Sequence, residues 1–272
     1  MSTPTYPAGR TLRTSLGQVA PHVLLLLFAC AAVGPFVWTL IQSFQPTDPD
    51  VTWTTRNYNQ VINYDAFASS YMNSAIVAVS VTIFAVVTSI LVGFVLAKYR
   101  FRGREQLFTA LIAALMVPFS AILIPVYVTV VHLGFNDSLG GLIVAGMWSP
   151  FGIFTVRQFL EGIPSELLDA ARIDGASEWR IVGQLMAPLC SSGLTVLAVY
   201  TFMRTWDDFL LPSILLNGPA HWTLPVLLTG GMGASTPAVS AVVVLTTLPA
   251  LIITTVTTKY FIRGIALASV HG

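Results

Sequence analysis

Long stretches of the chain contain no charged residue, and the charged residues gather in short segments between them. The apolar runs within these stretches are continuous and do not alternate, which favours helices over the strands of a membrane barrel. A helix of about 20 apolar residues crosses a hydrocarbon layer about 30 Å thick. We therefore predict an all-α polytopic membrane protein with six transmembrane helices. The predicted crossings lie near residues 23–41, 74–97, 107–131, 142–160, 189–211 and 239–262.

Composition supports a protein embedded in a lipid bilayer. Of the 272 residues, 55% are hydrophobic and 9% are charged, and the mean hydropathy is +0.77. So few charges do not make an ordinary solvated surface. Arg10 and Arg13 precede the first apolar run, but no small-x-small cleavage pattern follows it. We interpret this segment as a retained first helix and not as a signal peptide.

Basic residues predict the orientation of the six crossings, because they concentrate in cytoplasmic loops. Arg56 lies alone on one side, and Arg204 falls inside the fifth crossing. The other side holds Arg10, Arg13, Lys98, Arg100, Arg102, Arg104, Arg157, Arg172, Arg180, Lys259 and Arg263. We therefore place this second side, with both chain termini, in the cytoplasm.

This orientation divides the chain into a cytoplasmic N-terminal segment, a membrane domain and a short tail. The predicted bounds are 1–22, 23–262 and 263–272. Within the membrane domain, residues 161–188 form a cytoplasmic loop. External loops are expected at 42–73, 132–141 and 212–238, the last containing an external or re-entrant segment at 217–233.

Two smaller features lie along the membrane domain. Pro118 and Pro125 are seven residues apart in the third crossing, so they lie on nearly the same helix face and are expected to bend it in the same direction. The basic turn "KYRFRGRE", residues 98–105, separates the second and third crossings. We interpret this turn as an anchor of the topology.

The stretch "ELLDAARIDGASEWR", residues 166–180, is densely charged in a chain that is otherwise poor in charge. Ser165 can cap a helix in which Asp169 and Arg172 pair three residues apart. Gly175 can end that helix in a left-handed conformation, and Ser177 can cap a second helix that runs until Pro188. A patterned helix-turn-helix on the cytoplasmic face predicts a docking surface. Its candidate residues are Glu166, Asp169, Ala170, Ala171, Asp174, Gly175, Ala176, Glu178, Arg180 and Pro188.

The run "DAARIDGASEWRIVGQLMAP" resembles the cytoplasmic coupling motif of ATP-binding-cassette (ABC) importer permeases. The pattern of that motif is Glu-Ala-Ala, three residues, Gly, nine residues, an apolar residue, two more residues and Pro. Asp169 replaces the glutamate and keeps a carboxylate. The matching positions, with unbroken spacing, are Asp169, Ala170, Ala171, Gly175, Leu185 and Pro188.

Flanking blocks extend the resemblance to the carbohydrate-uptake group, the maltose-permease G-like subunits. The similar blocks cover roughly residues 101–272, and they are "FRGREQLF", "IPSELLDAARIDGAS", "RTWDDFLLPSILL", "TLPVLL" and "YFIRGIALASVHG". Asp207 stands where that family usually has Asn. The resemblance implies an ABC importer type I permease (MetI-like) fold in the cell (inner) membrane. It also implies a second homologous permease, two ATPase subunits that bind the ATP and Mg, and an external solute-binding protein.

No catalytic, metal or cofactor site is predicted in the chain itself. A nucleotide loop of the P-loop type needs Gly-Lys, but the two lysines, Lys98 and Lys259, follow Ala and Thr. Cys30 and Cys190 have no metal-ligand spacing, and the four histidines are scattered. A net charge of +1 argues against a nucleic-acid partner. We therefore expect a non-catalytic subunit.

"RTWDDF" near the end of the fifth crossing is the candidate solute pathway. Arg204 precedes Asp207 and Asp208 by three and four residues, so a local ion pair is expected inside the bilayer. One interpretation is that this pair only steadies the helix end. The other is that Trp206 and Asp207 border the pathway, with the ring stacking on a sugar face. Both interpretations remain open at this point.

The leading hypothesis is a permease subunit that imports a sugar or sugar-derived solute and is coupled to ATPase subunits through residues 166–180. A small neutral saccharide is favoured, with a sugar phosphate or glycerophosphodiester as the alternative. The competing class is a self-sufficient secondary transporter or channel. Such a transporter is expected to carry ion-coupling carboxylates near mid-membrane. The charge-free intervals hold none, which weighs against that class.

Overall fold

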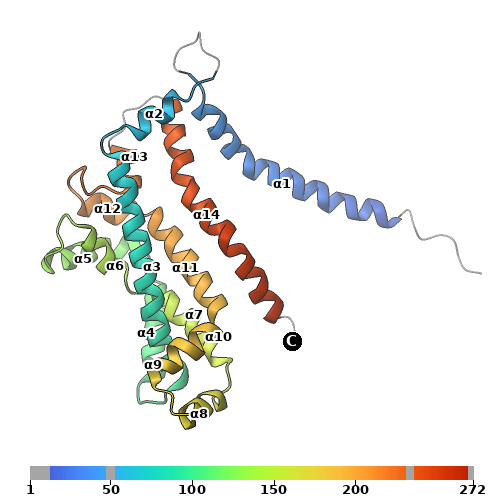
Figure 1. Cartoon of the computed structure of the whole chain (residues 1–272), viewed down its shortest axis with the longest axis vertical. Helices are drawn as coiled ribbons and strands as arrows, with labels where there is room; N and C mark the ends of the chain where they lie inside the picture. Colours follow the sequence, from blue (N-terminus) through green and yellow to red (C-terminus); the bar gives the residue numbers. More distant parts are fainter. Residues whose placement is uncertain (1–12, 47–52, 231–235, 269–272) are drawn as a thin grey trace, which may run out of the picture. The chain divides into compact units, whose positions relative to one another are not determined.

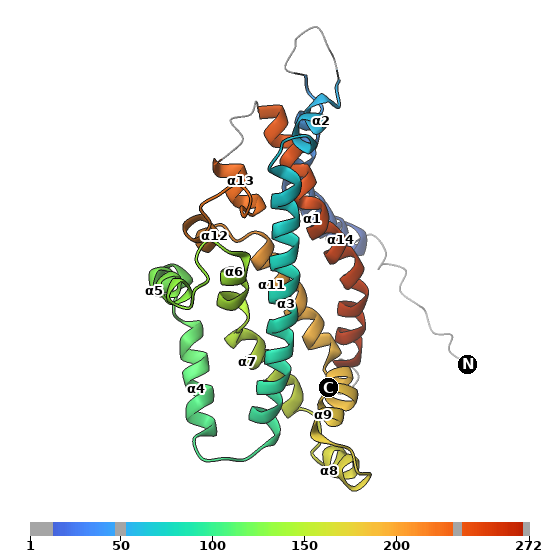
Figure 2. The same cartoon turned by 60° about the vertical axis from the view of Figure 1, so that its left-hand side comes forward.

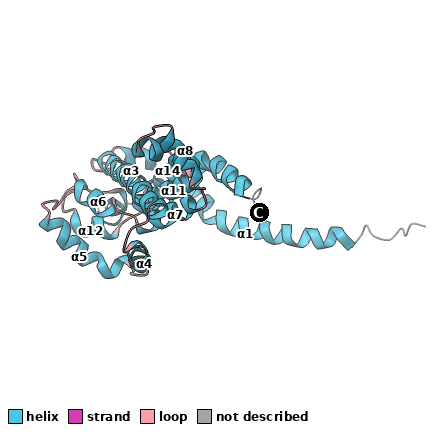
Figure 3. Cartoon of the chain, turned by 90° about the horizontal axis from the view of Figure 1, so that it is seen from below, coloured by secondary structure: helices cyan, strands magenta, loops and turns pink. Residues whose placement is uncertain are grey.

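The computed structural model of the chain describes residues 13–46, 53–230 and 236–268, and all the regular structure in these ranges is helical (Figure 3). Four of the described helices are long and apolar enough to cross a membrane, or up to six if each of two bent pairs is one span. The predicted all-α polytopic architecture is confirmed. The helices are α1 Arg13–Ser43, α2 Arg56–Ile62, α3 Phe67–Lys98, α4 Arg104–Leu115, α5 Phe119–His132, α6 Leu139–Gly146, α7 Pro150–Glu161, α8 Glu166–Ile173, α9 Glu178–Arg180, the π-helix η1 Ile181–Met186, α10 Ala187–Leu189, α11 Ser191–Trp206, α12 Leu210–Leu215, α13 Leu224–Gly230 and α14 Thr236–Ala268.

The chain forms two compact units, the first comprising Met1–Gln60 and Ala234–Val244. In this unit α1 contains the predicted first crossing, as Pro21–Ser43. The Asn57 side-chain amide donates to the carbonyls of Ser43 and Gln45 at 2.8 and 2.9 Å. The Tyr58 hydroxyl lies 2.7 Å from Ser43 Oγ. These bonds hold the start of α2 against the end of α1.

The second unit, Val61–Gly233 with Leu245–Gly272, is built around α3. α3 packs along α7 and α11 over much of its length (Figure 2). The close approach depends on Gly152 of α7, where an added Cβ would overlap Ser89 Oγ and lie 2.9 Å from the Leu197 side chain. The side chains that α3, α7 and α11 bury together form one apolar cluster, which includes Ile90, Phe94, Val156, Leu160 and Leu197.

The sequence predicts a single bent helix for the third crossing. That prediction is wrong, because the crossing is interrupted. α4 ends at Leu115, α5 begins at Phe119, and the two helices are bent by 106°. Pro118 precedes α5 with an extended backbone, ψ of 136°. A residue before proline avoids the helical region, which explains why the chain leaves α4 just before Pro118. Pro125 lies inside α5 and does not end it.

The fifth predicted crossing also differs from its expected bounds. α11 begins at Ser191 and ends at Trp206, short of the predicted 211. The helical path that starts at Glu178 continues past Pro188 to Leu189, one residue beyond the prediction, and is bent by 83° from α11. In the fourth crossing, α6 and α7 are separated by a short break, and Ser149 caps α7 by accepting from the Gly152 amide.

The remaining predictions on domain bounds concern the chain ends and the outer segments. The second crossing lies in α3 and the sixth in α14. The predicted N-terminal segment falls outside the described residues up to 12, and the predicted tail does so from 269 onward. Residues 47–52 and 231–235 of the predicted external loops also lie outside them.

Candidate functional site

Two short helices joined by a tight turn form the segment between α7 and α11 (Figure 1). α8 ends at Ile173, and Gly175 follows with a φ of +79°. The Gly175 amide donates to the Arg172 carbonyl, and the Ala176 amide donates to the Ala171 carbonyl, both at 3.0 Å. This pair of bonds is the Schellman arrangement that closes a helix with a left-handed residue. The predicted role of Gly175 in ending the helix is confirmed.

The two predicted serine caps have different outcomes. Ser177 caps the second helix as predicted, because its Oγ accepts from the Arg180 amide at 3.4 Å. Ser165 precedes α8, but its side chain makes no capping hydrogen bond, so that prediction is wrong. A capping residue normally has an extended backbone. Ser177 has a ψ of 157°, whereas Ser165 has a ψ of −24° and already continues the helix.

Arg172 joins the two short helices to each other and to the end of α3. Its Nη1 lies 3.5 Å from Asp169 Oδ1, which is the ion pair predicted from their spacing. Its Nε lies 3.0 Å from Glu178 Oε1 across the Gly175 turn. Its Nη2 donates to the Tyr99 hydroxyl at 3.4 Å. One side chain therefore fixes the angle between α8 and α9.

The charge state of this junction is stable around neutral pH. A hydrogen bond with Tyr99 and then one with Arg172 lower the pKa of Glu178. The hydrogen bond with Glu178, followed by burial, raises the pKa of Tyr99. A lowered carboxyl pKa gives stability that is lost only as pH falls through the folded value, and a raised tyrosine pKa gives stability that is lost only as pH rises through it. Around neutral pH, Glu178 is therefore charged and Tyr99 is neutral, the states that these hydrogen bonds favour.

One face of the segment is anchored in the apolar core of the second unit. Leu168 of α8 and Ile181 and Met186 of η1 are almost completely buried. They belong to the same apolar cluster as Phe94 of α3 and Leu160 of α7. Burying side chains of this size contributes about 1.5–3 kcal/mol each. The segment is thus a fixed projection of the core and not a loose connector.

The opposite face exposes two large apolar side chains. Ile173 and Trp179 are 86% and 76% exposed, although both are of types that proteins usually bury. The sequence analysis missed both, because it weighted charge in this stretch. The available signal was an apolar residue at the last position of α8 and another in α9, at the start of the second helix. Of the predicted docking residues, Ala171 and Ala176 are half-buried, and the exposed ones are Glu166, Asp169, Ala170, Asp174, Gly175, Glu178, Arg180 and Pro188.

A second candidate site is a cavity of about 570 Å³ bordered by the break between α4 and α5, the break between α6 and α7, and α11. Trp148 and Tyr200, 51% and 48% exposed, supply aromatic surface to it. Arg204 and Asp208 also line it. Aromatic faces beside charged and hydroxyl groups are the chemistry that binds a polyhydroxylated solute. Further polar lining comes from Ser74, Ser149, Thr201, Thr205 and Thr223.

The structure brings two of the four predicted pathway residues to this cavity. Arg204 and Asp208 line it, whereas Trp206 and Asp207 do not. Trp206 is 3% exposed, and its Nε1 donates to the Thr246 carbonyl at 3.1 Å. The Trp206 ring is therefore packed inside the protein and is not available to stack on a sugar.

The predicted ion pair at this helix end is also absent. No contact within 4.0 Å joins Arg204 to Asp207 or Asp208 in the described part of the chain. The Arg204 guanidinium lies 5.6 Å from the centre of the Phe119 ring. Asp208 Oδ1 instead accepts from the Leu210 amide at 3.2 Å. One oxygen of the Asp208 carboxylate is therefore bonded to the turn after α11, because that turn leaves a backbone donor within its reach.

A third feature is the segment before α13, within the predicted external loop. Asn73 of α3 donates to the carbonyls of Ala220 and Trp222 at 2.9 and 3.0 Å. Ser74 Oγ accepts from the Leu224 amide at 2.8 Å. Residues 220–224 are therefore held against the first turns of α3, with the Ala220 side chain exposed.

The loop after α5 holds the same segment from its other side. Asp137 Oδ1 accepts from the Asn217 amide at 2.8 Å, and it lies 3.4 Å from His221 Nδ1. The Asn217 amide, and then His221, lower the pKa of the Asp137 carboxyl. Asp137 has a positive φ of 49°, which is uncommon for a residue other than glycine. Contacts with α3 and with the loop after α5 thus hold this segment from two sides.

Comparison with protein families gives a match over most of the chain. Residues 89–267 match the family described as "Binding-protein-dependent transport system inner membrane component". The matched range covers α4 to α13, so it includes the short-helix segment and all of the cavity lining except Ser74, Val77 and Val81.

Individual relatives and a solved structure are similar over three quarters or more of the chain. The chain is 29% identical over 261 residues to the arabinooligosaccharides transport system permease protein AraQ of Halalkalibacterium halodurans, covering 90% of this chain and 93% of AraQ. It is 31% identical over 208 residues to the sn-glycerol-3-phosphate transport system permease protein UgpE of Pectobacterium atrosepticum, covering 75% of this chain and 74% of UgpE. A chain of a bacterial ABC transporter that imports the acidic polysaccharide alginate has the same fold, with a TM-score of 0.82, 22% identity, and coverage of 95% of this chain and all of that chain.

Proposed function

The chain belongs to the family of binding-protein-dependent transport system inner membrane components, and we propose that it forms half of the pathway of an ATP-driven importer for a sugar or sugar-derived solute. The other half is a second, homologous permease. Two ATPase subunits dock on the cytoplasmic side, and an external solute-binding protein delivers the solute. Both termini and the segment from α8 to α10 lie in the cytoplasm.

The observation that carries this proposal is the two-faced segment between α7 and α11. Its inner face is fixed in the core by Leu168, Ile181 and Met186. Its outer face presents Ile173 and Trp179 among charged side chains. A fixed, charged surface with exposed aromatic and aliphatic anchors is suited to binding another protein. Since the chain lacks a Gly-Lys nucleotide loop, the partner supplies the ATP hydrolysis.

The solute class rests on the cavity and on the relatives together. The named relatives transport arabinooligosaccharides and sn-glycerol-3-phosphate, both rich in hydroxyl groups. In this chain Trp148 and Tyr200 offer aromatic faces, and Arg204 and Asp208 offer one charge of each sign. Opposite charges in one cavity favour a solute with no net charge, so we assign a small neutral saccharide.

Two neighbouring aspartates provide a test of the cavity. Asp208→Asn is expected to lower the maximal rate of uptake about tenfold or more, because a hydrogen bond to a charged group is worth about 1.5–3 kcal/mol. Asp207→Asn is the matched control, since Asp207 does not line the cavity. The measurement is uptake by the assembled transporter with saturating binding protein. A larger effect from Asp207→Asn than from Asp208→Asn would remove the cavity from the pathway.

The external segment gives a separate prediction on topology and partner. A cysteine at Ala220, in a Cys30→Ser chain, is expected to react with a membrane-impermeant reagent added outside, and saturating binding protein is expected to slow the reaction. A cysteine at Asp174 is the control, which should react only after the cytoplasmic side is opened. Reaction at Asp174→Cys from outside would reverse the proposed orientation. An unchanged labelling rate at Ala220→Cys with binding protein present would contradict the contact between this segment and the binding protein.

A further inference from the structure

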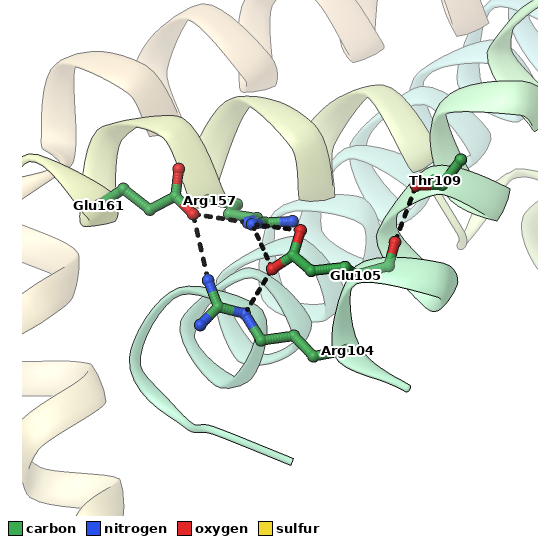
Figure 4. A network of polar contacts seen from close by, with 5 residues as sticks. All are labelled: Arg104, Glu105, Thr109, Arg157 and Glu161. Carbon is green, nitrogen blue, oxygen red and sulfur yellow. Dashed lines mark hydrogen bonds and ion pairs between the residues drawn. The ribbon is translucent and has the colours of Figure 1, made fainter. Parts of the chain in front are cut away.

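Four charged side chains form a network where α4 begins beside the last turns of α7 (Figure 4). Arg157 Nε donates to Glu161 Oε1 at 2.8 Å, and Arg157 Nη2 lies 3.2 Å from Glu105 Oε1. Arg104 Nη2 lies 3.3 Å from Glu161 Oε1, and Arg104 Nε lies 3.3 Å from Glu105 Oε1. Each cation thus contacts both carboxylates. Two of the four residues begin α4, and the other two lie in the last two turns of α7.

Arg157 is the buried centre of this network. It is 5% exposed, and its guanidinium lies 3.5 Å from the centre of the Phe108 ring. The Phe108 ring in turn stacks on Phe154 of α7. A buried guanidinium is costly unless carboxylates accept from it, so Glu105 and Glu161 are both needed where they lie. This requirement fixes the start of α4 against the end of α7.

Apart from this network and the stacking of Phe108 on Phe154, side-chain burial does little to hold α4 in the unit. None of its side chains is fully buried. Its far end and the break that follows it nevertheless form part of the cavity wall, through Ala114, Leu115, Val117, Pro118 and Phe119. The position of this wall therefore depends on how α4 is attached to α7.

The same turn also contacts the segment between α7 and α11, residues 162–190, which is called the docking segment below. Lys98 donates to the Ile163 carbonyl in the short link between α7 and α8. Tyr99 accepts from Arg172, the residue that sets the angle between α8 and α9. The turn that was interpreted as a topology anchor, residues 98–105, thus has the docking segment on one side and the ion network on the other.

We propose that residues 98–105, with Arg157 and Glu161, form the mechanical link that carries a displacement of the docking segment to α4 and so to the wall of the cavity. Glu105 and Arg157 act as positioning residues for transport and need not touch the solute. The link is a rigid attachment between packed elements, which move together when one of them is displaced. This inference rests on the proposed function, because it requires an ATPase that moves the docking segment.

The test follows the cavity wall directly and needs no knowledge of the solute. A cysteine at Leu115, which lines the cavity and is 42% exposed, is introduced into a Cys30→Ser chain within the complete transporter. Its reaction rate with a water-soluble thiol reagent is compared without nucleotide and after trapping with ATP and vanadate. The rates are expected to differ in this chain. Glu105→Gln is expected to abolish the difference while ATP hydrolysis and vanadate trapping continue.

Two further variants separate the link from a general structural role. Arg102→Gln removes a charge from an exposed position of the same turn and is expected to keep the nucleotide-dependent difference. Arg157→Lys keeps the charge but loses the forked contacts, so it is expected to reduce the difference. A full difference in Glu105→Gln would overturn the link, and so would equal loss in Arg102→Gln. Failure of the Leu115→Cys chain to retain any ATPase would instead overturn the proposed function.

Discussion

Replacing Gly175 with valine is expected to abolish transport and to release the ATPase subunits, while the chain still inserts into the membrane at a normal level. Gly175 has a φ of +79°, and nothing lies within 4 Å of an added Cβ, so the cost arises from the backbone and not from a clash. The left-handed conformation costs an L-residue roughly 1–2 kcal/mol, and a branched side chain costs more. A cost of about 2 kcal/mol reduces the competent conformation about 30-fold.

Loss of the left-handed turn also breaks the bonds that place the second helix. The amides of Gly175 and Ala176 would lose the carbonyls of α8, and the bridge from Arg172 to Glu178 would open. Gly175→Asn is the conservative control, because asparagine tolerates the left-handed region. The measurement is transport together with the amount of ATPase retained on the tagged chain. Normal transport and assembly in Gly175→Val would contradict the role of the turn.

Removal of the exposed anchors is expected to have a comparable effect on assembly. Trp179→Ala and Ile173→Asp should each weaken ATPase binding by about 2 kcal/mol or more, which is about 30-fold, because large side chains at the centre of an interface carry most of its binding energy. Trp179 is 76% exposed and Ile173 is 86% exposed, so neither change removes a core contact.

A matched control for the anchors lies in the first unit. Trp53 is 61% exposed and has the same side chain as Trp179. Trp53→Ala is expected to leave ATPase binding unchanged. The measurement is the dissociation constant of the purified ATPase subunit for the chain in lipid nanodiscs. Equal affinities for Trp179→Ala, Ile173→Asp and the unchanged chain would show that the ATPase does not bind at these two side chains.

Local patterns in the sequence predicted much of the membrane architecture. Runs of apolar residues located α1, α3 and α14, because a single helix satisfies its own backbone and needs only length and hydropathy. Proline spacing indicated bending in the third crossing, but the 106° angle between α4 and α5 depends on what the two helices pack against. The residue pattern along one helix therefore does not predict the angle of a break that packing between elements determines.

The candidate site divides along the same line. Gly175, Ser177 and the pair of Asp169 with Arg172 act over three to five residues, and the sequence spacing was sufficient to predict them. The contact of Arg157 with Glu105 joins residues 52 apart, so it became visible only after α4 and α7 were placed together.

Two tryptophans show why exposure did not follow from the sequence. Trp206 looked available to a solute in sequence, but tertiary packing supplied the Thr246 carbonyl as its partner. Trp179 was not singled out in the sequence, and the structure leaves it exposed at the start of the second short helix. Burial is decided by packing, and residue type alone does not determine it.

The central claim is that this permease transports solute only when an ATPase subunit is bound to residues 166–180. The most direct measurement is purification of the tagged chain from its own membranes in mild detergent, followed by an assay of ATP hydrolysis with and without loaded external binding protein. We predict that an ATPase subunit is retained and that loaded binding protein accelerates its hydrolysis. A chain that purifies without ATPase and still moves solute across liposome membranes without ATP would contradict the account.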